Sequence, residues 1–286
     1  MFAVERLIDL ALEEDIGTGD ITTEAIVSED AMGEGIVITR EEGIVPAGFS
    51  VARRVFEKLD KDVVFSPLVQ EGEAVAVNTR ILHIQGRMRA LLTGERTALN
   101  FMQRLCGIAT HVRAFGRGVE GSGITLVDTR KTTPGWRVLE KYAVRVGGAA
   151  NHRMGLYDGV LIKDNHIAAA GGVAAAVEAV RRRVSHLVKI EVEAETLGEV
   201  SQAVEAGADV ILLDNMDAGM IREAVDRIDG RSLVEVSGMV TPEKIKALGL
   251  AGVHIISAGA LTHQARAVDL SMRIAPPGKL RPEWAA

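Results

Sequence analysis

Cysteine, aromatic residues and long apolar runs are scarce in this 286-residue sequence. The single cysteine, Cys106, cannot form a disulfide within the chain, so the sequence predicts a cytoplasmic protein. Aromatic residues make up only 3% and the formal net charge is -6, which argues against nucleic acid as the main partner, because such surfaces need basic footprints and stacking rings. No apolar run reaches 18 residues, and residues 1–14 alternate apolar and acidic residues unlike a signal peptide, so no membrane association is expected.

Several common nucleotide-binding and catalytic motifs are also missing. No Gly-x-Gly-x-x-Gly follows a predicted strand, and the glycines of residues 118–123 have the wrong spacing, which excludes a Rossmann dinucleotide site. There is no Walker loop, no Gly-x-Ser-x-Gly elbow and no histidine–cysteine spacing for zinc. Cys106 lies in an apolar helical stretch and is expected in the core instead of acting as a nucleophile.

The second half of the chain alternates apolar, β-branched runs with stretches rich in Ala, Glu and Arg. Six such runs predict strands, at 124–128, 159–163, 187–193, 209–213, 233–237 and 253–257. The stretches between them predict helices, at 172–183, 196–206 and 218–228. This alternation indicates a parallel sheet covered by helices, in an α/β protein. Because six strands do not support closure to a standard eight-stranded barrel, we expect an incomplete or irregular α/β barrel.

The first part of the chain lacks this alternation and is expected to form an α+β sandwich domain with an antiparallel sheet. Strands are predicted at 33–40, 75–77 and 80–85, flanked by helices at 2–14 and 50–60. The predicted boundaries are 1–110 for this domain and 111–269 for the catalytic barrel, with the tail 270–286 joining the first domain.

Three polar strings follow strand-like or turn-like segments, at Asp128–Gly135, Asn151–Arg153 and Lys163–His166. They carry a group of basic residues, namely Arg130, Lys131, His152, Arg153 and Lys163. Cations gathered in a chain of negative net charge indicate an anionic ligand, because a guanidinium forks onto carboxylate or phosphate oxygens and an ammonium supplies a compact charge. The strings are expected to meet in one site, because active sites of α/β barrels gather at the carboxyl ends of the strands. By contrast, Arg137, Lys141 and Arg145 are spaced four apart on a predicted helix and are expected to be partly solvated.

Two carboxylates and two glycine-containing turns complete the predicted strand ends. Glu193 and Asp214 end successive strands, where they can hold Mg²⁺ or accept hydrogen bonds from sugar hydroxyls. Alternatively, each can cap the helix that follows it. Ser237-Gly238 and Gly259-Ala260 stand ahead of predicted helices and offer backbone N–H groups, the usual phosphate seat in this architecture.

Seven segments of the sequence together point to one family, namely residues 14–22, 94–100, 104–110, 128–135, 151–155, 161–167 and 213–216. Through these segments, and over nearly its whole length, the chain resembles the quinolinate phosphoribosyltransferase family. The most specific is Thr129–Gly135, followed roughly 30 residues later by Lys163–His166. Departures are mild, with Cys106 where serine is expected and Trp136 where leucine is common; they concern fine substrate contacts and not the reaction.

The resemblance implies a reaction between quinolinate and phosphoribosyl pyrophosphate that requires Mg²⁺ and gives nicotinate mononucleotide, pyrophosphate and CO₂. The implied quinolinate ligands are Arg96, Arg130, His152, Arg153 and Lys163. The implied ligands of phosphoribosyl pyrophosphate are Lys131, Glu193, Asp214, Ser237, Gly238, Gly259 and His263. The implied catalytic residues are Lys131, Lys163, Glu193 and Asp214, of which Glu193 and Asp214 would hold the Mg²⁺, directly or through water or substrate. The resemblance also implies a homodimer, or a multiple of one, in which Arg96 serves the partner's site.

Three alternatives remain open at this point. The chain can be the molybdenum-locus relative of the family, acting on another base. It can be a barrel aldolase in which Lys163 forms a Schiff base. It can also be a catalytically silent binding protein, although such a protein would typically have lost Lys131, Glu193 or Asp214, and all three are present.

Overall fold

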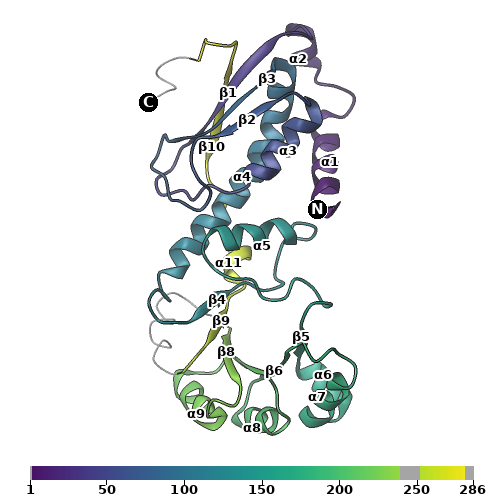
Figure 1. The fold of residues 1–286 in the computed structure, drawn as a ribbon, viewed down its shortest axis with the longest axis vertical. Coiled ribbons are helices and arrows are strands. Elements are labelled where there is room, and N and C mark those ends of the chain that lie inside the picture. Colours follow the sequence, from purple (N-terminus) through teal and green to yellow (C-terminus); the bar gives the residue numbers. More distant parts are fainter. Residues whose placement is uncertain (1, 239–251, 281–286) are drawn as a thin grey trace. The chain divides into compact units, whose positions relative to one another are not determined.

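The structure, a computed structural model, describes residues 2–238 and 252–280, and the chain divides into two compact units (Figure 1). The first unit comprises Met1–Arg113, Thr132–Gly148 and Thr262–Ala286, and the second comprises Ala114–Lys131 and Ala149–Leu261. The boundaries predicted from the sequence, 1–110 and 111–269, had assigned residues 132–148 and 262–269 to the barrel, whereas in the structure both segments pack within the first unit.

The first unit contains a four-stranded antiparallel sheet, as the sequence predicts. Its order is β10-β1-β3-β2, with β1 at Met32–Thr39, β2 at Val64–Pro67, β3 at Arg80–Arg87 and β10 at Leu270–Ala275. Its first three helices are α1 at Phe2–Ile16, α2 at Ile21–Ile26 and α3 at Phe49–Leu59. The strand predicted at 75–77 is wrong, because with the described residues this segment makes only a single antiparallel bridge, between Val75 and Ile44.

The first unit also contains α5 at Arg137–Val146 and most of α4 at Met88–Gly116, while the short α11 at Ala260–His263 begins in the second unit and ends in the first. Arg104 of α4 donates to Glu140 of α5 at 2.8 Å and to the carbonyl of Thr262 at 2.9 Å, which holds three distant segments together. Lys141 is fully buried, so the expectation of a partly solvated position was wrong for this residue. Cys106 is buried as predicted, and burial raises the pKa of its thiol to about 12.

The second unit is built on a parallel sheet of six strands, in the order β4-β9-β8-β7-β6-β5. The strands are β4 at Thr125–Val127, β5 at Val160–Ile162, β6 at Ile190–Ala194, β7 at Val210–Asp214, β8 at Leu233–Ser237 and β9 at Ile255–Ser257. The described helices between them are α6 at Asp164–Ala170, α7 at Val173–Arg181, α8 at Leu197–Glu205 and α9 at Ala218–Ile228. Figure 1 shows these helices lying along the outside of the strands. All six predicted strands are confirmed.

The sheet curls into an incomplete barrel, which confirms the predicted fold class. Within the second unit β4 is the first described strand along the chain and β9 the last, yet these two pair in register from Thr125–Ile255 to Val127–Ser257. Between β4 and β5 the described residues form no ladder, and β4 makes only a single parallel bridge there, from Val127 to Ala150. Strands that pair around a curled sheet bring their carboxyl ends together, so the polar residues after each strand converge.

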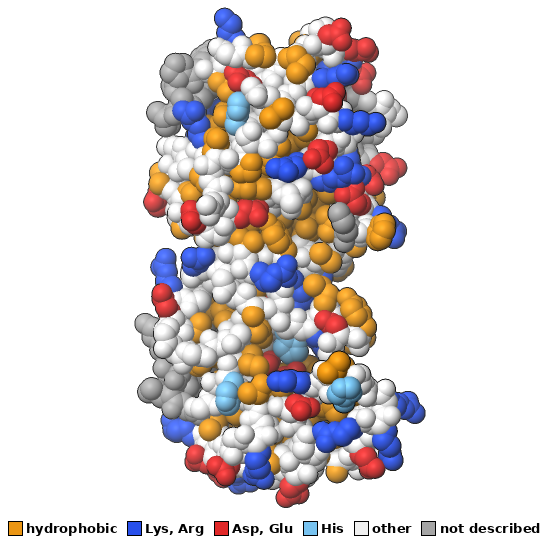
Figure 2. Space-filling model, viewed as in Figure 1, with side chains coloured by type: hydrophobic (Ala, Val, Ile, Leu, Met, Phe, Trp, Pro, Cys, Tyr) orange, Lys and Arg blue, Asp and Glu red, His pale blue; other side chains and the backbone are white. Residues whose placement is uncertain are grey.

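Charged side chains of both signs are interspersed on the face of the molecule in Figure 2. The basic residues of the three polar strings are therefore distinguished by their position at strand ends and not by an excess of positive charge on that face. Among the helices formed by residues 2–238 and 252–280, none combines the length and the apolar character that crossing a membrane requires.

Candidate active site

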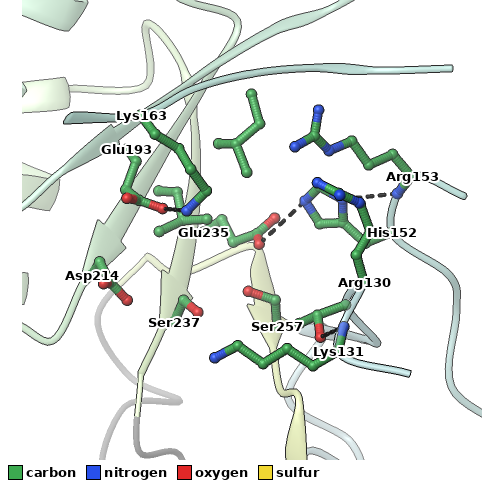
Figure 3. A pocket seen from close by; sticks show the side chains of 13 residues that line it. Arg130, Lys131, His152, Arg153, Lys163, Glu193, Asp214, Glu235, Ser237 and Ser257 are labelled. Atoms are coloured by element: carbon green, nitrogen blue, oxygen red, sulfur yellow. Dashed lines mark hydrogen bonds and ion pairs between the residues drawn. The ribbon is translucent and has the colours of Figure 1, made fainter. Parts of the chain in front are cut away.

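The carboxyl ends of the strands surround a cavity of about 330 Å³, which we call the strand-end pocket (Figure 3). Its described lining comes entirely from the second unit and comprises Thr129, Arg130, Lys131, His152, Arg153, Leu161, Lys163, Glu193, Leu212, Asp214, Glu235, Ser237 and Ser257. Asp214, Ser237 and Ser257 are the last residues of β7, β8 and β9. The structure therefore confirms the prediction that the three polar strings come together at the strand ends.

Asp128 ties the first two strings together. It is the residue directly after β4 and is completely buried. Its carboxylate accepts hydrogen bonds from the Asn151 amide at 2.6 Å and from the backbone N–H of His152 at 2.9 Å. A buried carboxylate must be compensated by such donors. The contacts fix the backbone that carries Arg130 and Lys131 relative to the backbone that carries His152 and Arg153.

Arg130 and Arg153 bring two guanidinium groups to one part of the strand-end pocket. Arg153 donates to the carbonyl of Gly159 at 3.1 Å. Burial, and then the positive charge of Arg130, lowers the pKa of Arg153 below its usual value. Like charges brought together at a partly buried position are costly, and an anion bound between them would relieve the repulsion.

Lys163 and Glu193 form an ion pair between neighbouring strand ends, from the residue after β5 to a residue of β6. Asp214 accepts a hydrogen bond from the Asn215 amide at 3.1 Å. Neither acid caps the following helix, since Thr196 caps α8 and Asp217 caps α9. The capping alternative is therefore wrong for both, and two carboxylates of neighbouring strands remain directed to the pocket, where they can hold a hard metal ion.

Beneath the basic residues lies a buried acid pair, Glu191 of β6 and Glu235 of β8, which the sequence interpretation missed. The two residues are 6% and 2% exposed. Nε2 of His152 lies 3.1 Å from Glu191 and 3.6 Å from Glu235. Among residues 2–238 and 252–280, Oε1 of each acid has no hydrogen-bond partner. The available signal was strand alternation, because Glu191 and Glu235 stand two residues before Glu193 and Ser237 and so share their face of the sheet.

The acid pair holds a proton near neutral pH. Burial raises the pKa of Glu235 to about 7, and the negative charge of Glu191 acts in the same direction, while His152 opposes the shift. Two carboxylates so close together in a site of low dielectric constant cannot both ionise without a large cost.

By ligand count, His152, Glu191 and Glu235 resemble a metal site, because their ligand atoms lie within 4.8 Å of one another. The histidine tautomer argues against this. The backbone N–H of Arg153 donates to Nδ1 of His152 at 2.8 Å, so Nδ1 carries the lone pair and Nε2 carries the hydrogen. A protonated nitrogen cannot bind a metal ion, and Nε2 is the nitrogen that faces the two acids.

The remaining predicted residues lie outside the described lining of the pocket. Gly238 has φ 120°, and a Cβ there would lie 2.5 Å from the Asn215 side chain, so only glycine fits. Gly259 follows β9 and precedes α11. The residues after Gly238 that complete its predicted phosphate seat are among those outside the described ranges. Arg96, on α4, and the exposed His263, at the end of α11, belong to the first unit.

Comparisons with known proteins agree with this architecture. The model of the quinolinate phosphoribosyl transferase N-terminal domain matches residues 20–106, and that of the C-terminal domain matches residues 108–273. A probable carboxylating nicotinate-nucleotide pyrophosphorylase of Bacillus subtilis (strain 168) is 42% identical over 271 residues, which is 95% of this chain and 93% of that protein. Quinolinate phosphoribosyltransferase [decarboxylating] 1b of Nicotiana tabacum is 39% identical over 96% of this chain and 83% of its own length. The solved nicotinate-nucleotide pyrophosphorylase of Francisella tularensis is 42% identical, with a TM-score of 0.90 over 96% of both chains.

The raised pKa of Glu235 predicts a pH-dependent stability. Its folded pKa of about 7 lies above the ordinary 4.5, so the folded state keeps a proton that the unfolded state releases between these values. Stability from this group is fully present below pH 4.5 and falls as the pH rises to about 7. Glu235→Gln should therefore gain, relative to the wild type, on the order of 3 kcal/mol between pH 4.5 and pH 8 in urea unfolding. A wild-type-minus-variant difference that is constant across this range would contradict the raised pKa.

Proposed function

The chain belongs to the quinolinate phosphoribosyltransferase family, and we propose that it carries out the reaction of that family in the strand-end pocket. It transfers the phosphoribosyl group of phosphoribosyl pyrophosphate to the ring nitrogen of quinolinate. The 2-carboxylate then leaves as CO₂, and the products are nicotinate mononucleotide and pyrophosphate. The protein is thus a pentosyltransferase of NAD biosynthesis, a carboxylating nicotinate-nucleotide pyrophosphorylase. The observation that carries this proposal is the pair of guanidinium groups of Arg130 and Arg153 in one pocket with Lys131 and Lys163.

Quinolinate, a ring with two adjacent carboxylates, fits the basic side of the pocket. Arg130 and Arg153 are assigned to the carboxylates, because a guanidinium fork matches the two oxygens of a carboxylate. Lys163, directly after β5, adds an ammonium, and His152 lines the pocket beside the two arginines. Arg96 is assigned to the same substrate from a second copy of the chain.

Phosphoribosyl pyrophosphate is assigned to the other side of the pocket. Lys131 faces the pyrophosphate, and Glu193 and Asp214 face the ribose hydroxyls. Ser237, Gly238, Gly259 and His263 are assigned to the 5′-phosphate. Glu193 and Asp214 also fit Mg²⁺, since an ion of this kind is usually held by one or two carboxylates together with substrate oxygens. When bound, the ion supplies positive charge to the departing pyrophosphate.

Catalysis then comes from position and charge. The anomeric carbon gains cationic character as pyrophosphate departs, and Lys131 and Lys163 stabilise the negative charge that leaves. Glu193 keeps the Lys163 ammonium directed into the pocket. No covalent nucleophile is needed, and the thiol of Cys106 is buried in the first unit.

The alternatives are less well supported. A Schiff-base aldolase needs a lysine amine that is free to attack a carbonyl, whereas Lys163 is engaged in an ion pair with the Glu193 carboxylate. The molybdenum-locus relative and the silent binding protein are not favoured, because the matching families and relatives carry the quinolinate phosphoribosyltransferase name and Lys131, Glu193 and Asp214 all line the pocket.

The proposal includes a cytoplasmic location and a homodimer, or a multiple of one. A buried free thiol is compatible with a reducing compartment. The dimer is supported by Arg96, which lies on α4 in the first unit and lines a separate hollow with Asp15, Asp20 and Thr93, whereas the described lining of the strand-end pocket belongs to the second unit. A partner can close the pocket and exclude water from the reaction.

Substrate choice tests the proposed function. With phosphoribosyl pyrophosphate and Mg²⁺, quinolinate should give CO₂ and nucleotide, and nicotinate, which lacks the 2-carboxylate, should react poorly. Buried polar groups left without their partner can lower kcat/KM by about 10⁴-fold. Comparable kcat/KM values for the two acids would refute the assignment.

Subunit mixing tests the shared site. Arg96→Ala and Lys163→Ala should each be inactive alone. After subunit exchange, half of the dimers by random pairing should be heterodimers, each with one intact site, so activity should recover to about a quarter of the wild type. A control mixture combines Lys58→Ala, on α3, with Lys163→Ala. The Lys58→Ala chains keep both Arg96 and Lys163, so this mixture is active before and after exchange. Any change in its activity measures the nonspecific effects of exchange. A mixture that stays inactive despite verified exchange would mean that Arg96 does not act in trans.

A further inference from the structure

The proposed reaction needs a proton at a defined carbon. When the C2–carboxylate bond breaks, CO₂ leaves without the bonding electron pair, which stays on C2 beside the cationic ring nitrogen. The product, nicotinate mononucleotide, carries a hydrogen at C2. One proton must therefore reach C2 in each turnover, and the site has to provide a donor.

Most groups that line the strand-end pocket are poor donors. Arg130 and Arg153 do not release protons near neutral pH. Glu193 and Lys163 are engaged with each other in an ion pair. His152 directs neither nitrogen to the pocket, because Nδ1 accepts from Arg153 and the Nε2 hydrogen faces the buried acid pair. Lys131 and Asp214 are assigned to pyrophosphate and ribose.

Glu235 has the properties expected of a proton donor to the pocket. It lines the pocket although only 2% of the residue is exposed, and its Oε1 has no hydrogen-bond partner in the part of the chain that the structure describes. The groups that face it come from each neighbouring element: Glu191 of β6, Leu212 of β7, Ser257 of β9 and His152. Burial and the charge of Glu191 both favour the protonated form. Figure 3 shows the carboxyl between His152 and Ser257.

We propose that Glu235 is the general acid that protonates C2 after CO₂ has left, an inference that rests on the proposed function. The electron pair on C2 takes the proton of the Glu235 carboxyl, a new C–H bond forms, and the carboxylate remains. The positive charge of the ring nitrogen stabilises the carbanion until this transfer occurs. No oxidant, reductant or further reactant is required.

A second hollow offers a path for reloading the acid. It has a volume of about 430 Å³ and shares His152 and Arg153 with the strand-end pocket, but it also reaches Glu191. Val160 and Val210, the first residues of β5 and β7, line it, so it opens at the opposite ends of the strands. The Nε2 hydrogen of His152 lies between the two acids. A proton from water in this hollow can thus reach Glu191 and pass directly to Glu235, with which Glu191 shares a hydrogen bond.

Single-turnover analysis of the Mg²⁺-loaded enzyme tests the proposal, because it separates pyrophosphate release from nicotinate mononucleotide formation. Glu235→Gln keeps the shape of a protonated glutamate but has no acid proton. Pyrophosphate release should stay within about 3-fold of the wild type, while nicotinate mononucleotide formation should fall by about 100-fold or more, the usual contribution of a general acid. Without the proton, the electron pair on C2 adds back to the CO₂ that has not yet left the site and re-forms the C2–carboxylate bond, so the nucleotide that still carries both carboxylates should accumulate. Glu205→Gln, the same change at an exposed position of α8, should leave both rates unchanged.

Glu235→Asp provides a second readout if the glutamine variant folds poorly. Aspartate keeps the acid but withdraws it by one methylene, so the two rates should separate by a smaller factor, about 10-fold, and part of the activity should return. The proposal is overturned if both rates fall together or if neither changes in these variants. A wild-type enzyme that does not convert quinolinate at all would instead refute the proposed function.

Discussion

The site depends on the compensation of one buried negative charge, the carboxylate of Asp128. The barrel is incomplete next to β4, where the described residues make only the bridge from Val127 to Ala150 instead of a strand pair. Asp128 extends that contact by accepting from the Asn151 amide and the His152 backbone. Because an uncompensated buried carboxylate is costly, the two segments are held together wherever the unit is folded. Their basic side chains consequently face the same cavity.

The resulting pocket combines a group of basic side chains with a buried pair of acids. Arg130 and Arg153 repel each other, and the acid pair of Glu191 and Glu235 relieves its own repulsion by keeping a proton. Each of these two electrostatic repulsions serves one step of the proposed reaction. The guanidinium groups receive a dianionic substrate, and the retained proton meets the electron pair that decarboxylation leaves behind. Substrate binding and acid catalysis thus draw on the same charge arrangement, in a chain whose net charge is -6.

Features encoded locally could be predicted from the sequence, and features decided by packing could not. The six strands and the strings after them were found because apolar runs and turn residues are local signals. Glu191 and Glu235 were missed because an acid inside an apolar strand has no local meaning until a second strand places another acid beside it. Lys141 has the helical spacing of a surface residue, yet the first unit buries it completely. The grouping of residues 132–148 with the first unit likewise depends on distant contacts, such as Arg104 with Glu140.

Exchanging the partners of the Asp128–Asn151 contact tests the central claim most directly. The kcat/KM for quinolinate would be measured for Asp128→Asn, for Asn151→Asp and for the double variant. Each single change leaves a buried group without a suitable partner, a cost of about 1–3 kcal/mol, and should lower kcat/KM by about 10- to 100-fold. In the double variant the amide and the carboxylate change places, and the carbonyl oxygen of the amide introduced at position 128 can still accept from the His152 backbone. The kcat/KM of the double variant should therefore return to within about 5-fold of the wild type. Single variants with wild-type activity, or a double variant no better than the worse single, would contradict the account.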